Sequence, residues 1–213
     1  MSDDLPAGGR PISAEECERR WAPWSPEEIA TRLAGVSAPW GVAAGWALDL
    51  FVGATTRAHG DLEISVPRSA FVEIAAALPE YEWDVVGDGR VWPYAETADY
   101  PALHQTWLRD RSSGRYHLDV FREPHEGDRW ICRRDESITL PYADLIDIGS
   151  AGIPYVIPEV TLLFKAKARR PKDDADFARV LPLLAEERKA RLAEWVSRVH
   201  PGHAWLAALT GSS

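Results

Sequence analysis

The stretch DLEISV, residues 61–66, narrows the choice of fold more than any other part of the sequence. Three apolar residues alternate here with three polar ones, which is the period-two pattern of a β-strand that buries one face. The segments on either side have helical spacing instead: residues 44–53 end at a glycine, and residues 67–80 carry an apolar stripe. A strand placed between two helices predicts a fold that mixes α and β structure.

The N-terminal part contains two helix-start signals. Ser13 is followed at capping-box spacing by Glu16, and Ser25 is followed in the same way by Glu28. We expect residues 1–12 to be flexible. They contain no apolar run, so we expect no secretory signal there.

The middle of the chain carries strand signals separated by turn residues. Asp88-Gly89 is a hairpin dipeptide, and the RSSG turn occupies residues 111–114. The candidate strands of this region are residues 81–87, 90–94, 104–110, 115–123, 128–135 and 137–142.

From Pro158 onward the pattern is helical. Pro158 suits the first turn of a helix, and Pro171 stops that helix before three further helical stretches. We therefore predict an α+β domain over residues 1–155 and a helical C-terminal region over residues 156–213.

The composition restricts the function classes. A formal net charge of −9 argues against non-specific nucleic-acid binding and is compatible with a small cationic ligand. Hydrophobic residues make up 46% of the chain, but no stretch is long enough to span a bilayer. Cys17 and Cys132 are far apart and lack metal-ligand spacing, so a reducing cytoplasm is the expected location.

Three acidic residues form a candidate metal site. On a strand, Asp61 and Glu63 project from the same face, about 6.5–7 Å apart. Asp119 falls on the polar side of a second predicted strand. Carboxylate oxygens are ligands that Mg²⁺ prefers, so the three acids together indicate a magnesium site. For an isolated Asp-x-Glu pair, solvent-facing strand positions are the better interpretation, and the segments on both sides are what favour a metal site.

The segment AAGWALDLFVGATTRAHGDLEI, residues 43–64, resembles the start of the aminoglycoside and lincosamide nucleotidyltransferases, which belong to the polymerase-β-like superfamily. Those proteins carry a glycine-containing turn and helix, then a Thr-Arg-x-His loop, then an acidic pair on a strand. The resemblance is strong over residues 40–67 and returns at residues 118–120 and 160–177. The matching residues are Gly45, Trp46, Ala47, Leu48, Asp49, Thr56, Arg57, His59, Asp61 and Glu63.

The resemblance implies a small mixed sheet flanked by helices, with the C-terminal helices closing a cleft. It implies an enzyme that moves a nucleoside monophosphate from a nucleoside triphosphate to a hydroxyl group. ATP is the first expected donor. Two Mg²⁺ ions would serve as cofactors. The acceptor would be a small molecule such as an aminoglycoside- or lincosamide-like antibiotic, and antibiotic resistance would follow.

The resemblance also implies roles for individual residues. Asp61 and Glu63 would bind metal, and Asp119 would be either a third ligand or the general base. Gly45 would let the backbone approach the phosphates at a helix start.

Other contacts to the nucleotide are expected from basic residues. Arg57 would contact a phosphate or brace its loop, whereas His59 would be structural. In the basic segment over residues 165–172, Lys167 and Lys172 are the expected phosphate contacts, although such a run is commonly a solvated helix face. Asp173, Asp174 and Asp176 are expected to occupy the start of the next helix, where negative charge suits the dipole.

Two positions depart from the family pattern. Ala44 stands where the family has Gly at the nucleotide-binding turn, and its Cβ makes close approach to a phosphate harder. Glu63 stands where the antibiotic enzymes often have Asp, and its longer side chain would shift the metal. Two alternatives therefore stay open: a toxin-type nucleotidyltransferase acting on tRNA or protein, and a non-catalytic relative that binds a nucleotide or a partner.

Overall fold

The computed structural model describes residues 5–98, 100–168 and 170–211. Strands dominate the first two thirds of this chain, and most of them are short. Their bounds are β1 Arg10–Pro11, β2 Gly41–Val42, β3 Glu63–Pro67, β4 Glu82–Gly87, β5 Arg90–Pro93, β6 Gln105–Arg109, β7 Tyr116–Glu123, β8 His125–Glu126, β9 Arg129–Ile131, β10 Thr139–Pro141, β11 Ile146–Ile148 and β12 Pro154–Val156.

Helices flank these strands and form the C-terminal third. Their bounds are α1 Ala14–Arg20, α2 Pro26–Arg32, α3 Ala44–Val52, α4 Phe71–Ala77, α5 Tyr94–Thr97, α6 Tyr142–Leu145, α7 Pro158–Lys165, α8 Pro171–Val180, α9 Glu186–Val199 and α10 Trp205–Thr210, with short 3-10 helices at Arg68–Ala70 and Leu181–Leu183.

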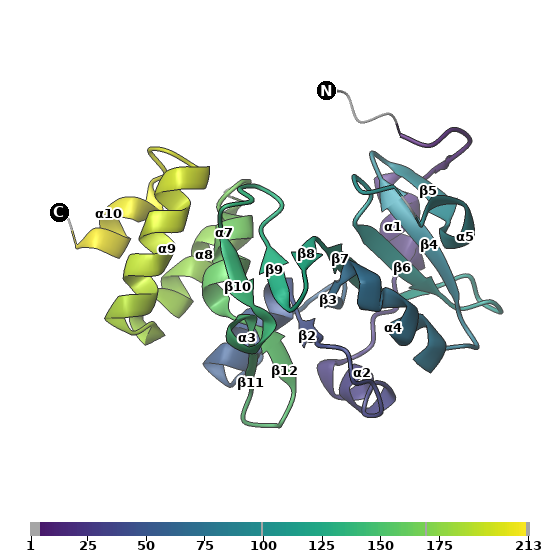
Figure 1. The fold of residues 1–213 in the computed structure, drawn as a ribbon, viewed down its shortest axis with the longest axis horizontal. Helices are drawn as coiled ribbons and strands as arrows, with labels where there is room; N and C mark the ends of the chain where they lie inside the picture. Colours follow the sequence, from purple (N-terminus) through teal and green to yellow (C-terminus); the bar gives the residue numbers. More distant parts are fainter. Residues whose placement is uncertain (1–4, 99, 169, 212–213) are drawn as a thin grey trace.

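A mixed sheet runs through the molecule in the order β1-β5-β4-β6-β7-β3-β2-β12-β11, and β10-β9-β8 form a small second sheet. In its centre β3 pairs parallel with β7 and antiparallel with β2. The helices α7–α10 lie at one end of the molecule, and α1 with β4 and β5 lies at the other (Figure 1). The predicted α+β fold, a mixed sheet flanked by helices with further helices at the C-terminus, is confirmed.

Local sequence signals account for most of these elements. The hydroxyls of Ser13 and Ser25 cap α1 and α2 by accepting hydrogen bonds from Glu16 N at 3.0 Å and Glu28 N at 3.2 Å. At the end of α3, Gly53 adopts a φ of 81°, which is the left-handed conformation that glycine tolerates.

Two apolar cores hold the sheet and the helices together. One gathers buried residues of α2, α4 and the central strands, among them Ile29, Ile64 and Phe71. The other joins β9, β12 and the C-terminal helices through residues such as Trp130 and Leu163. Each of these five residues is at most 1% exposed, so both cores exclude water at their centres.

Three local differences from the sequence predictions matter for the site. Strand β3 begins at Glu63, so Asp61 lies in the loop that leads into it. Helix α7 ends at Lys165, and Pro171 starts α8 instead of merely stopping α7. Arg10–Pro11, within the segment expected to be flexible, pairs with β5, whereas residues 1–4 lie outside the described part.

Within the described residues, no helix combines the length and apolar character needed to cross a bilayer.

Candidate active site

A pocket of about 510 Å³ lies where the central strands meet α3, α7 and the start of α8. Both halves of the chain contribute to its wall. Asp61 and Glu63 line it from β3 and its approach, Gly45 from α3, and Lys165 and Lys172 from the C-terminal helices. The pocket therefore contains acidic and basic groups drawn from segments more than a hundred positions apart.

Glu63 and Asp119 are directly opposite each other in the parallel pair β3–β7. The backbone N–H of Asp119 donates to the carbonyl of Leu62 at 2.8 Å, which ties the two acidic positions together through the ladder. Asp119 is 4% exposed, Glu63 is half-buried, and Asp61 is exposed at the entrance of the strand. The structure thus brings the three predicted acids to one region of the sheet.

The pKa values of the two inner carboxyls are raised. For Asp119, burial is the largest cause, the charge of Asp61 adds to it, and the pKa rises to about 7. For Glu63, burial and the charges of Asp61 and Asp119 raise the pKa well above its ordinary value. Buried acids whose pKa values are raised further by neighbouring carboxylates form a site that favours a bound cation.

One carboxylate oxygen of Asp119 is available to bind a ligand. Its Oδ2 accepts from Gln105 Nε2 at 2.7 Å, whereas its buried Oδ1 has no hydrogen-bond partner. No group of three or more His, Cys, Asp or Glu side chains within the described ranges is already arranged around a metal position. An unpartnered carboxylate oxygen beside two further acids nevertheless fits a hard divalent cation, because such ions take oxygen ligands and retain several waters.

The start of α3 adjoins this acidic region. Ala43 N donates to the carbonyl of Glu63 at 2.8 Å, and no side chain caps the helix. Ala44 has a φ of 51°, a left-handed conformation that is strained for any residue with a Cβ. The first N–H groups of α3 are therefore left without a side-chain acceptor, as in helix termini that bind anions.

Gly45 has a packing role that the sequence did not indicate. A Cβ at this position would lie 2.5 Å from Arg57 Nη2 and 2.6 Å from His59 Nδ1. The glycine therefore allows the loop before β3 to close onto α3. Gly45 also lines the pocket, so its predicted contact with phosphate is compatible with this packing.

A hydrogen-bonded network centred on Asp49 orders the loop. Asp49 is 5% exposed and accepts from Thr56 N at 3.1 Å, from the Thr56 hydroxyl and from His59 Nε2 at 2.7 Å. The His59 ring stacks on Trp46 at a centroid distance of 4.3 Å. Burial lowers the pKa of His59 although Asp49 acts to raise it. These contacts agree with the structural role expected for His59.

An ionic cluster missed by the sequence reasoning supports the basic wall. Asp176 on α8 binds Lys165 at 2.9 Å and Arg57 at 3.3 Å. Asp173 binds Lys165 at 3.2 Å and Arg170 at 2.8 Å. Both aspartates are buried, with side chains 3% and 0% exposed, so they are more than exposed helix-start residues.

Burial acts to raise the pKa of each of these two aspartates, but hydrogen bonds from their basic partners lower it below the ordinary value. The helical spacing of Lys165, Asp173 and Asp176 was visible in the sequence, but only the turn between α7 and α8 makes them partners.

The predicted phosphate contacts are only partly brought together. Arg57 and Lys172 line the pocket, as do Lys165 and Arg170. Lys167 is exposed and is not among the lining residues. It lies beyond the end of α7 at Lys165, and its charge adds to burial and the charge of Arg134 in lowering the pKa of His200. Arg169, another member of the basic segment, lies outside the described residues.

Comparison with known proteins places the fold. The N-terminal part matches the model of the aminoglycoside-2''-adenylyltransferase family over residues 27–102. The lincosamide antibiotic adenylyltransferase LnuA, solved with lincomycin, is 17% identical with a TM-score of 0.51, covering 80% of this chain and 98% of its own.

ANT(2'')-Ia in complex with adenylyl-2''-tobramycin is 15% identical with a TM-score of 0.53, covering 81% of this chain and 95% of its own. The search of curated proteins produced no match. The resemblance expected from the sequence is confirmed, the chain has the fold of these nucleotidyltransferases, and the matches support an enzyme of that class.

Proposed function

We propose that this protein catalyses the metal-dependent transfer of a nucleoside monophosphate to a hydroxyl group. The proposal starts from the nucleotidyltransferase fold and from the confirmed resemblance to the aminoglycoside-2''-adenylyltransferases. ATP is the expected donor, and a small hydroxylated molecule is the acceptor. Aminoglycoside- or lincosamide-like antibiotics are the first acceptors to test, because the structural matches include proteins solved with such compounds. Antibiotic resistance and a cytoplasmic location remain predictions.

One observation carries this proposal. Glu63 and Asp119 are opposite each other on β3 and β7, both have raised pKa values, and Asp61 contributes to each shift. Keeping such carboxyls close costs stability unless a cation compensates. Asp61 and Glu63 line a pocket of about 510 Å³, and the buried Asp119 lies opposite Glu63 on the neighbouring strand, so this part of the fold is suited to a reaction that uses bound cations.

Asp61, Glu63 and Asp119 would hold the divalent ions, as many as two. When bound, such ions neutralise charge on the triphosphate and activate the attacking oxygen. Asp119 has a second role available to it. Its unpartnered Oδ1 and pKa near 7 suit a group that accepts the hydroxyl proton of the acceptor at neutral pH.

The basic wall would hold the triphosphate tail. Lys172 lines the pocket and acts electrostatically on Glu63, so its ammonium group lies close to the acids. Lys165 and Arg170 also line the pocket, but their charges are shared with Asp173. Lys172 is therefore the most available phosphate contact of this wall, with the N–H groups at the start of α3 facing the same space.

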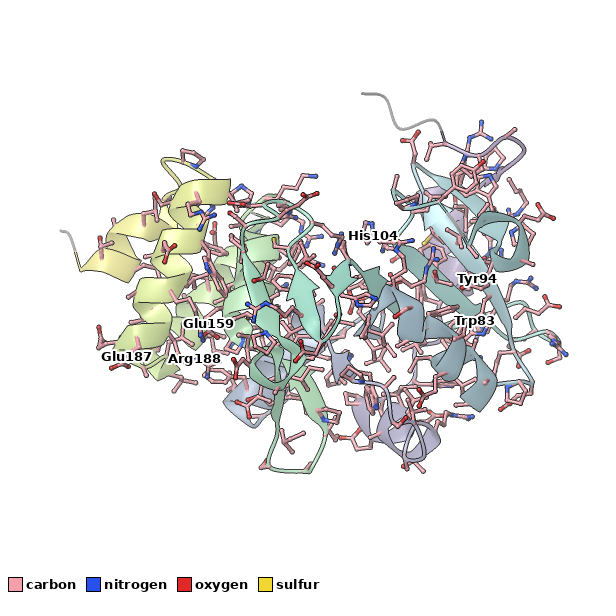
Figure 2. The ribbon with its side chains drawn as sticks, viewed as in Figure 1. Trp83, Tyr94, His104, Glu159, Glu187 and Arg188 are labelled. Atoms are coloured by element: carbon pink, nitrogen blue, oxygen red, sulfur yellow. The ribbon has the colours of Figure 1, made fainter. Side chains whose placement is uncertain are left out.

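The C-terminal region over residues 156–213 would close the cleft over the nucleotide. Helix α7 supplies Val160, Thr161, Phe164 and Lys165 to the pocket wall. An ion pair joins α7 to α9: Arg188, which is partly exposed, binds the buried Glu159 through hydrogen bonds of 2.8 and 2.6 Å (Figure 2). This helical region can thus act as a rigid wall.

The test has two stages. First, the melting temperature is measured with ATP or GTP, each with and without Mg²⁺; stabilisation that requires both nucleotide and metal is expected. Second, several triphosphates are incubated with an acceptor panel, and mass spectrometry detects an added nucleoside monophosphate. Indifference to nucleotide and metal would instead favour a non-catalytic relative.

A further inference from the structure

For the proposed reaction, the residues of β7 define the direction in which an acceptor would extend away from Asp119. Asp119, Phe121 and Glu123 occupy alternate positions of β7, so they share one face at intervals of about 6.5–7 Å. The acceptor hydroxyl must reach Asp119, whereas the start of α3 and the basic wall take the triphosphate. The rest of the acceptor therefore lies along β7 toward Phe121 and Glu123, both of which line the pocket.

Glu123 is the carboxylate at this end, and it is already neutralised. Its side chain is 4% exposed, and its two oxygens accept hydrogen bonds of 2.9 and 3.2 Å from Arg133. Arg133 also donates to His104 Nε2 at 2.5 Å. Burial, together with the charge of Arg133, lowers the pKa of His104 to about 3, so this ring is neutral.

His104 is labelled in Figure 2, near the middle of the molecule. The group formed by His104, Glu123 and Arg133 offers no free negative charge to a ligand.

Arg134 carries a positive charge that no described carboxylate neutralises by an ion pair. Its guanidinium lies 4.6 Å from the Phe164 ring centroid, and its Nη1 donates to the carbonyl of Leu163 at 3.0 Å. It is half-buried and lines the pocket, and no carboxylate pairs with it within the part of the chain that the structure describes. Phe121 and Phe164, both only partly buried, supply apolar surface beside it.

On the basis of the proposed function, we propose that the acceptor is a hydroxylated molecule with an apolar ring and an anionic group, a carboxylate or a phosphate. The ring packs on Phe121 and Phe164, and the anion binds Arg134. A polycationic acceptor would place ammonium groups beside the Arg134 guanidinium, where the carboxylate at this end of the pocket, Glu123, is already paired with Arg133, and this disfavours it in a partly desolvated pocket. The net charge of −9 acts over the whole surface and does not alter this local preference.

The experiment uses three matched probes that share a ring and several hydroxyls but differ in charge: phenyl glucuronide, phenyl glucoside and phenyl glucosaminide. Binding to the full chain is measured by calorimetry with and without ATP and Mg²⁺, and adducts are detected by mass spectrometry. We expect the glucuronide to bind about tenfold more tightly than the glucosaminide. Raising the salt concentration should reduce this difference.

Two variants and a control assign the preference to Arg134. Arg134→Gln should remove most of the preference for the glucuronide, and Arg134→Glu should reverse it. Arg129→Glu makes the same charge change on the exposed side of β9, where Arg129 contacts Thr139 outside the pocket, and should leave the order intact.

Tighter binding of the glucosaminide, or an order unchanged in both Arg134 variants, would overturn the inference even if adducts form. Absence of magnesium-dependent ATP binding would instead overturn the proposed function, because probe binding is also measured without nucleotide.

Discussion

Glu63 and Asp119 face each other across the parallel strands β3 and β7, and each carboxyl lies in surroundings that favour its neutral form. An ordinary sheet places an acid opposite a basic or neutral residue, because like charges directly opposite are destabilising. The pair therefore represents a local cost to folding that a bound cation would remove. Four predictions test this relationship and its surroundings.

The metal-free protein should lose stability as the pH rises. Both carboxyls have raised folded-state pKa values, so their favourable contribution is complete below the unfolded pKa near 4. It is lost as Asp119 ionises through its pKa of about 7. Urea titrations between pH 4 and 8 in chelator should show this loss, about 1 kcal/mol or more.

Two controls accompany that measurement. Asp119→Asn should flatten the decline with pH, and added Mg²⁺ should restore stability at pH 8. A decline that is equally steep in Asp119→Asn would mean that other groups cause it.

Asp61→Asn should lower turnover without lowering the stability of the metal-free protein. The change removes the charge that raises the pKa of both Glu63 and Asp119, so the metal-free fold should be as stable or slightly more stable. Turnover should fall at least about a hundredfold, because a metal ligand is lost where charge develops. Asp144→Asn, at an exposed position of α6, is the matched control for both assays. Unfolding of Asp61→Asn would assign Asp61 a structural role.

Ala44→Gly should stabilise the protein. Ala44 has a φ of 51°, and releasing its Cβ from this conformation gains about 1–2 kcal/mol, offset by about 0.5–1 kcal/mol of backbone entropy. A net gain of about 0.5–1 kcal/mol in chemical denaturation is expected, with turnover retained. Ala44→Val should lose stability, since a β-branched side chain fits the left-handed region poorly. Equal destabilisation by Gly and Val would show that the Ala44 methyl packs favourably.

Asp176→Asn should be strongly destabilising. The carboxylate binds Arg57, Lys165 and Arg179, and its side chain is 3% exposed. Removing its charge takes an ion-pair partner from all three cations and leaves Lys165 paired with Asp173 alone, at a cost of about 3 kcal/mol. Asp174→Asn on the same helix should cost at most about 1 kcal/mol, because an amide oxygen can still accept the Trp205 Nε1 hydrogen bond of 2.7 Å. Equal melting temperatures for the two variants would contradict the ionic-cluster interpretation.

Local signals in the sequence determined a large share of this fold. Ser13 and Ser25 start their helices, Gly53 ends another, and Asp88-Gly89 turns the β4–β5 hairpin with φ values of 47° and 68°. Each of these signals acts within a few residues, so no knowledge of distant contacts is needed to interpret it. The acidic pair and the strongest part of the family resemblance likewise lie in one continuous segment, residues 40–67.

Tertiary structure decided what surrounds that segment. The parallel pairing of β3 with β7 sets Asp119 opposite Glu63. Helix α7 ends at Lys165, which lines the pocket, whereas Lys167 lies beyond the helix and is exposed. Asp173 and Asp176 became buried partners of Lys165 only because α8 folds back against α7. Charge pairing and burial depend on which distant segments meet, and neither periodicity nor capping residues encode that meeting.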